Sequence, residues 1–202
     1  MSLARQAGFS LIELMITVVL LFLLVMIGLP SMSEWLQKTQ IRTAAETLMF
    51  GLQEARSEAI RRNSFVRFQL VTSLGSDCVL KSSATNWVVS MDDPSGMCDA
   101  APSDTAAPRI LQSKSGAEGA PNATVSATGG GAATAFAVFN GMGRLSGAGN
   151  IDTIDIANPV GGACQHSASA GPMRCLRVTI APGGDVRLCD PKVTDASDLR
   201  HC

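Results

Sequence analysis

The sequence predicts an α+β protein in which one long N-terminal helix packs on a C-terminal domain of two β-sheets. An almost uninterrupted apolar run over residues 9–29 is followed, beyond Pro30, by a segment with helical periodicity. After Asn63 the apolar residues alternate with polar ones, as in half-buried strands. We expect four segments: residues 1–8 as a leader, 9–30 as a transmembrane helix, 31–63 as its amphipathic continuation and 64–202 as a β-rich head.

Composition limits the range of functions. The chain has 202 residues, of which 46% are hydrophobic and 16% are charged, and its formal net charge is -1. This length suffices for an anchor and one domain with its own core. A nearly neutral chain has no global attraction to nucleic acid or anionic lipid, so either partner would require a local basic patch.

The apolar run is long enough to cross a bilayer. Its residues 9–29, interrupted only by Ser10, Glu13, Thr17 and Gly28, would form a helix of about 31 Å. The leader carries Arg5 and no acidic residue, which favours a cytoplasmic leader and an outward C-terminal portion. A cleaved secretory signal fits less well, because the run is too long and residues 29–31 match the cleavage pattern poorly.

Glu13 is unusual in this setting, because a charge inside a membrane segment costs about 2.5 to 3.5 kcal/mol and less near an end. A cut between Gly8 and Phe9 would offset this cost. The new α-amino group of one subunit could then meet Glu13 of a neighbour when the helices pack side by side. We therefore interpret Glu13 as an assembly contact.

The string GFSLIELM from Gly8 onward, after a short basic leader, resembles the class III signal of type IV prepilins and type II secretion pseudopilins. The resemblance implies that prepilin peptidase cuts after Gly8, that Phe9 becomes the N-methylated N-terminus, and that Glu13 and Pro30 serve assembly. It also implies a single-pass protein of the bacterial inner membrane with a periplasmic C-terminal domain, later present in the pilus at or near the tip. The implied partners are other major and minor pilins, prepilin peptidase and the pilus assembly platform.

The second half of the helix has one apolar stripe and one charged face. The stripe is predicted to contain Trp35, Ile41, Ala44, Ala45, Leu48, Leu52, Ala55 and Ala59. The charged face is expected to be solvated, with a DNA or lipid patch of Arg56, Arg61 and Arg62 as the alternative. Residues 44–46 (AAE) and 53–59 (QEARSEA) resemble the GspH/FimT branch of the pilin superfamily, which consists of minor pilins.

In the head, we expect strands at residues 66–70, 87–91, 109–112, 135–139, 151–156, 176–180 and 186–189. Residues 141–144 and 182–185 are predicted to form tight turns, because glycine supplies positive φ without steric cost. Residues 94–108 and 129–131 are predicted to form surface loops.

The cysteines all follow the apolar run, which favours an oxidising compartment and disulfide bonds. Fifteen connectivities are open, and we predict nearest-neighbour pairing. The predicted pairs are Cys78 with Cys98, Cys164 with Cys175, and Cys189 with Cys202. The alternative is a zinc site formed by Cys164, His166, Cys175, Cys189 and His201, but these residues lack the paired C-x2-4-C spacing. We therefore expect no metal site.

The sequence contains no motif for a nucleophile elbow, a zinc protease or a phosphate-binding loop, so we expect neither an enzyme nor a cofactor. DNA is the alternative partner, because some FimT-like minor pilins that serve natural transformation carry a C-terminal Gly-Arg-x-Arg turn. Here the corresponding turn is GDVR at residues 184–187, in which Asp185 replaces the first Arg. An acid beside phosphate is repulsive. The candidate DNA contacts are Arg174, Arg177, Arg187 and Lys192.

The sequence thus predicts a minor pilin of a type IV pilus that helps to prime or cap assembly. Two alternatives remain open at this point. One is a DNA-binding minor pilin for natural transformation, and the other is a GspH-like pseudopilin of type II secretion.

We predict that replacing Gly8 with a bulky residue blocks processing, because the peptidase must accommodate the residue that precedes the cut. Intact-mass measurement of the membrane-extracted protein should then show the whole leader retained, whereas the parent protein should lack its first eight residues. A variant mass that also lacks these residues would contradict the assigned cleavage position.

Overall fold

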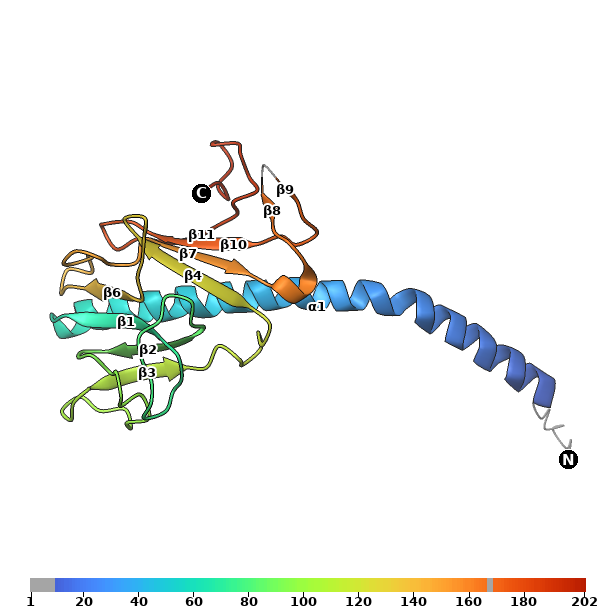
Figure 1. The fold of residues 1–202 in the computed structure, drawn as a ribbon, viewed down its shortest axis with the longest axis horizontal. Helices are drawn as coiled ribbons and strands as arrows, with labels where there is room; N and C mark the ends of the chain where they lie inside the picture. The colour runs from blue at the N-terminus through green and yellow to red at the C-terminus, as the bar shows by residue number, and fades with distance from the viewer. Residues whose placement is uncertain (1–9, 167–168) are drawn as a thin grey trace, which may run out of the picture. The chain divides into compact units, whose positions relative to one another are not determined.

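The computed structural model describes residues 10–166 and 169–202, without the side chains of residues 27–31, 166, 169 and 170. The chain divides into two compact units, Met1–Leu36 and Gln37–Cys202. Helix α1 (Leu11–Arg62) contributes to both units, and all the strands that the structure describes belong to the second (Figure 1).

In the first unit, Ser10 caps the start of α1. The backbone N–H of Glu13 donates a hydrogen bond to Ser10 Oγ at 3.2 Å. Gly8 and Phe9, where we expect processing, lie outside the described residues. Among the described residues, no helix has the length and hydropathy that a membrane crossing requires.

The second unit contains two larger antiparallel sheets, so the predicted α+β fold class with a long N-terminal helix is confirmed. The first sheet has the order β3 (Ile110–Lys114), β2 (Asn86–Ser90), β1 (Val66–Val71) and β6 (Phe136–Phe139). The second sheet has the order β11 (Val186–Cys189), β10 (Leu176–Ile180), β7 (Thr153–Ala157), β4 (Thr124–Gly129) and β5 (Ala132–Ala133). A short 3-10 helix, η1 (Pro159–Gly161), precedes a small hairpin of β8 (Gln165–His166) and β9 (Ser169–Ala170).

The apolar stripe of α1 from Ile41 to Ala59 is buried against the inner faces of both sheets in one core. Gly51 allows the closest approach: a Cβ there would lie 2.8 Å from the Phe68 ring and 3.0 Å from the Trp87 indole. These two rings, from β1 and β2, lie 5.8 Å apart between centroids. The stripe prediction was wrong at Trp35, which belongs to the first unit and is 63% exposed.

Strands β4 and β5 were missed by the sequence analysis. Strand β4 is built of Ala, Ser, Thr and Gly around Val125, so its alternation is carried by small side chains. The loop predicted at residues 129–131 was wrong for Gly129, which ends β4 and is buried; a Cβ there would lie 1.9 Å from the Asn150 carbonyl oxygen. Residues 94–108 contain no helix or strand, as predicted.

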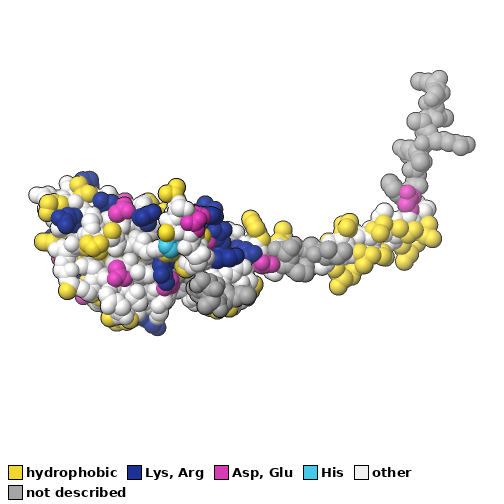
Figure 2. All heavy atoms as spheres, turned by 90° about the horizontal axis from the view of Figure 1, so that it is seen from above, with side chains coloured by type: hydrophobic (Ala, Val, Ile, Leu, Met, Phe, Trp, Pro, Cys, Tyr) yellow, Lys and Arg dark blue, Asp and Glu magenta, His cyan; other side chains and the backbone are white. Residues whose placement is uncertain are grey.

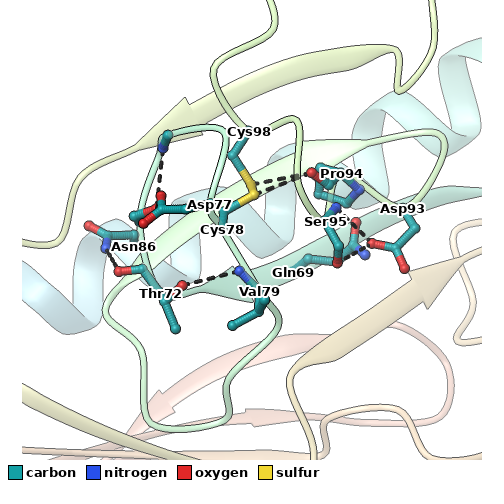
Figure 3. Close-up of a disulfide and its surroundings, with 12 residues drawn as sticks. Gln69, Thr72, Asp77, Cys78, Val79, Asn86, Asp93, Pro94, Ser95 and Cys98 are labelled. Atoms are coloured by element: carbon teal, nitrogen blue, oxygen red, sulfur yellow. Dashed lines mark hydrogen bonds between the residues drawn. A yellow bond between two sulfur atoms is a disulfide. The ribbon is translucent and has the colours of Figure 1, made fainter.

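Three disulfides join neighbouring cysteines, in the pairing that the sequence analysis predicts. They are Cys78–Cys98, Cys164–Cys175 and Cys189–Cys202. The first bridge lies against the backbone of Pro94, whose carbonyl oxygen is 3.3 Å from Cys78 Sγ (Figure 3). It belongs to a second, smaller core with Val71, Val88 and Ile110 on the outer face of the first sheet.

We predict that Cys78→Ala/Cys98→Ala lowers the free energy of unfolding by roughly 3 kcal/mol, because the bridge restrains a loop with a sequence separation of 20 and both cysteines are buried. The matched pair Cys189→Ala/Cys202→Ala should cost less, because Cys202 is exposed. Urea unfolding of the oxidised full chain in detergent measures both losses. A larger loss for the C-terminal pair would contradict the importance of the smaller core.

Candidate assembly helix and candidate nucleic-acid surface

The first unit exposes apolar side chains all around its helix. Every large hydrophobic residue from Leu11 to Met26 is exposed, and the exposed fractions range from 47% at Val25 to 79% at Leu11. Figure 2 shows these hydrophobic side chains along the described part of the helix. A helix that is apolar on all sides requires lipid or other helices to cover it. This part of α1 therefore has the surface of an element that is buried in a membrane or in an assembly.

Glu13 is the only charged side chain among residues 10–26 and is exposed. The Ser10 cap places it in the first turn of α1, where the N-terminal end of the helix dipole favours a negative charge. Pro30 lies within α1, and it has no N–H to donate to the helix carbonyl four residues earlier. These are the two described positions at which we expect assembly roles.

Two of the four candidate DNA-contacting residues already form ion pairs with carboxylates of the head. The guanidinium of Arg174 pairs with Asp190, whose side chain is only 3% exposed. Arg177 donates two hydrogen bonds to Asp155 on the neighbouring strand β7, at 2.7 and 3.0 Å. Both arginines are thereby compensated within the head, so they offer less attraction to a phosphate backbone.

Arg187 and Lys192 are less restrained. Arg187 is exposed on β11, opposite Thr179 of β10. Arg177 lies opposite Cys189 in the same register, so Arg177 and Arg187 share the outer face of the second sheet. Lys192 Nζ donates to Gln165 Oε1 at 2.8 Å. The four basic residues therefore do not form a single patch of unpaired positive charge.

The turn that carries Asp185 packs against another turn. Gly184 has φ of +80°, and a Cβ there would lie 1.8 Å from the carbonyl oxygen of Gly143. The N–H of Leu145 donates to the carbonyl of Pro182 at 3.2 Å. The predicted turns at residues 141–144 and 182–185 therefore hold one another, and Gly184 is explained by this close approach.

The arginines of the amphipathic helix segment form an ion-pair cluster. Glu58 accepts hydrogen bonds from Arg61 at 2.6 Å and Arg62 at 2.7 Å, and Arg62 also pairs with Asp104 at 2.6 Å. The hydrogen bond from Arg61 is the main cause that lowers the pKa of Glu58 below its ordinary value. Arg56 differs, because its buried Nε has no hydrogen-bond partner in the described part of the chain. The charged face of α1, which was predicted to be solvated, is therefore partly an ion-pair network that links α1 to the 94–108 loop.

Comparison with known proteins identifies the family. The family model described as type II transport protein GspH matches residues 44–184, and the model of the prokaryotic N-terminal methylation motif matches residues 3–29. The chain belongs to the GspH family. The predicted resemblance to GspH/FimT-type minor type IV pilins is confirmed, and the chain is a minor pilin or pseudopilin.

Solved structures of the Pseudomonas aeruginosa type IV minor pilin FimU are similar to this GspH-family chain. One crystal form has 18% identity and a TM-score of 0.43, and the match covers 77% of this chain and 98% of FimU. A second form has 19% identity and a TM-score of 0.43, with 78% and 93% covered. No curated protein matches the chain. The GspH match ends at Gly184, so Arg187 and Lys192 lie beyond it.

We predict that the Glu58 cluster makes stability pH-dependent. Because the folded-state pKa of Glu58 is depressed, its contribution is present above the ordinary value of 4.5 and is lost as the pH falls through the folded-state value. The difference in melting temperature between the parent protein and Glu58→Gln should therefore be larger at pH 7 than at pH 3. Equal differences at both values would contradict an ion-pair role.

Proposed function

We propose that this protein is a minor pilin of a type IV pilus, that prepilin peptidase cleaves it after Gly8, and that it helps to prime or cap filament assembly. The observation that carries the proposal is the first unit, an all-round apolar helix with Glu13 as its only charge among residues 10–26. The protein is first held in the bacterial inner membrane with its head in the periplasm, and then passes into the pilus, at or near the tip.

The charge of Glu13 explains how a subunit would be incorporated into the filament. Cleavage after Gly8 creates an α-amino group on Phe9 that remains protonated at neutral pH. Among packed apolar helices this cation and the Glu13 carboxylate of an adjacent pilin neutralise one another, and low dielectric strengthens their attraction. An unpaired Glu13 would instead remain as a charge in apolar surroundings, which is costly. Assembly is therefore favoured when the two groups meet.

Each alternative has its own test. A role in type II secretion is favoured by the description of the matching family, and normal secretion in a deletion strain would argue against it. DNA binding receives less support from the geometry, because Arg174 and Arg177 are paired and Asp185 adjoins the turn. The absence of a gel shift at low salt with the full chain in detergent would argue against it.

We predict that Glu13→Ala inserts into the membrane normally but is recovered in sheared filaments at roughly one tenth of the parent level or less, since a charge-assisted pair contributes about 1.5 to 3 kcal/mol. A deletion strain carrying the parent gene, Glu13→Ala or the control Glu54→Ala should be compared. Glu54 lies on α1 in the second unit, so its variant should behave like the parent.

The same strains test the function as a whole. Loss of surface pili in the deletion strain, restored by the parent gene, is expected. Unchanged pili in the deletion strain would overturn the role in pilus assembly, and equal recovery of Glu13→Ala would overturn the pairing.

A further inference from the structure

A cavity of about 650 Å³ opens on the outer face of the first sheet, within the second unit. Arg67 of β1, Phe136 of β6, Met91 and Arg109 are among the residues that line it. Val66 and Phe68, the neighbours of Arg67 in β1, are buried in the main core, so Arg67 projects from the opposite face of the strand. None of the lining residues belongs to the first unit or to the candidate DNA contacts.

Two polar atoms on residues that line the cavity are buried and have no partner among the described residues. They are Arg67 Nε and Ser64 Oγ, and both residues line the cavity. Buried donors are nearly always satisfied, because an unmade hydrogen bond costs free energy. An acceptor brought by a ligand would satisfy Arg67, and the Ser64 hydroxyl could donate to the same group.

The charged groups at the cavity have an excess of one positive charge. Arg109 pairs with Asp92 through two hydrogen bonds, at 2.7 and 2.5 Å. These hydrogen bonds are the main cause that lowers the pKa of Asp92, and the charge of Arg67 adds a smaller contribution. Two guanidinium groups thus face one carboxylate. The excess is a single positive charge, which suits one carboxylate better than a polyanion.

The remaining walls are apolar. Phe65 is 58% exposed at the cavity, and Met91, Phe136 and Val138 add further apolar surface. Aromatic side chains and arginine are both enriched in protein interfaces, and here an exposed Phe65 lies at the same cavity as an arginine whose Nε is buried. The cavity therefore fits a group that carries an apolar side chain next to its carboxylate.

Strand addition at the neighbouring sheet edge is blocked. The free edge of β6 is already used, because Ser146 N–H donates to the Val138 carbonyl at 2.9 Å and Ile151 N–H to the Phe136 carbonyl at 2.8 Å. Val138 N–H in turn donates to Asn150 Oδ1 at 2.8 Å. Recognition at this face consequently depends on side chains that enter the cavity.

We propose that the cavity binds a peptide segment of another pilin subunit that presents one carboxylate beside an apolar side chain. The carboxylate accepts hydrogen bonds from Arg67 and Ser64, and the apolar side chain packs on Phe65 and Phe136. This inference rests on the proposed function, because the partner is a subunit of the same filament.

Binding is measured with the full chain in detergent, labelled with 13C at its methionine methyl groups. The probe is N-acetyl-Phe-Glu-amide, and the control ligand is N-acetyl-Phe-Gln-amide, which has the same shape without the charge. The Met91 methyl signal should shift with saturation on titration of the probe. The Met142 signal should not move, because Met142 does not line the cavity and is 73% exposed. The uncharged ligand should bind at least tenfold more weakly.

Two variants test the residues. Arg67→Gln should weaken probe binding at least tenfold, whereas the control Arg187→Gln, on the other sheet, should leave it unchanged. Phe65→Ala should weaken the binding of both ligands, and because Phe65 is exposed this variant should keep the fold of the head. An unmoved Met91 signal, equal binding of the two ligands, or unchanged binding by Arg67→Gln would overturn the proposal.

A single-stranded oligonucleotide, dT6, distinguishes the competing partner class. Tighter binding of dT6 than of the peptide at Met91 would overturn the peptide assignment in favour of nucleic acid. Because none of these titrations needs a filament, the outcome is independent of pilus recovery in the deletion strain. The binding proposal and the proposed function can therefore fail separately.

Discussion

The packing of one helix stripe between two sheets is the constraint on which the head depends. Residues from Ile41 to Ala59 lie at helical spacing and meet the inner faces of both sheets in a single core. Gly51 permits the Phe68 and Trp87 rings to approach the helix backbone. Each sheet thereby has one face committed to the core, and only the outer faces and loops remain for recognition.

The two outer faces have different chemistry. The first sheet carries the small core around Cys78–Cys98 and, near β6, the cavity with Arg67. The second sheet carries hydroxyl side chains and the Arg177–Asp155 pair, in which each charge has its partner on an adjacent strand. Among the described residues, the unpartnered donors of Arg67 and Ser64 thus lie on β1 or just before it, whereas Arg177 on the second sheet is already paired, which makes the first sheet the better candidate for binding a partner.

Sequence patterns predicted what depends on local periodicity. The α1 stripe and strands such as β1 and β10 were predictable because bulky apolar residues recur at periods near 3.6 and 2. Strand β4 was not predicted, because Ala, Ser and Thr give little contrast in hydrophobicity between its two faces. The prediction that Trp35 is buried was wrong, because periodicity does not say where the sheets stop covering the helix. The pairs Arg174–Asp190 and Arg177–Asp155 join residues 16 and 22 positions apart, so only the tertiary structure could reveal them. Arg67 and Ser64 carried no sequence signal for the same reason.

The two units have surfaces of different specificity, and we therefore expect them to have different roles. In the proposed assembly, the apolar helix whose only carboxylate among residues 10–26 is Glu13 would pair with any subunit that has the same helix and a free amino group, so it would not choose between neighbours. Choice between partners requires groups that penalise the wrong one, such as a buried donor left unpaired. In the described part of the chain, Arg67 and Ser64 line an open cavity and each carries a buried donor of this kind. Selection of neighbours is therefore expected to reside in the head, and admission to the filament in the helix.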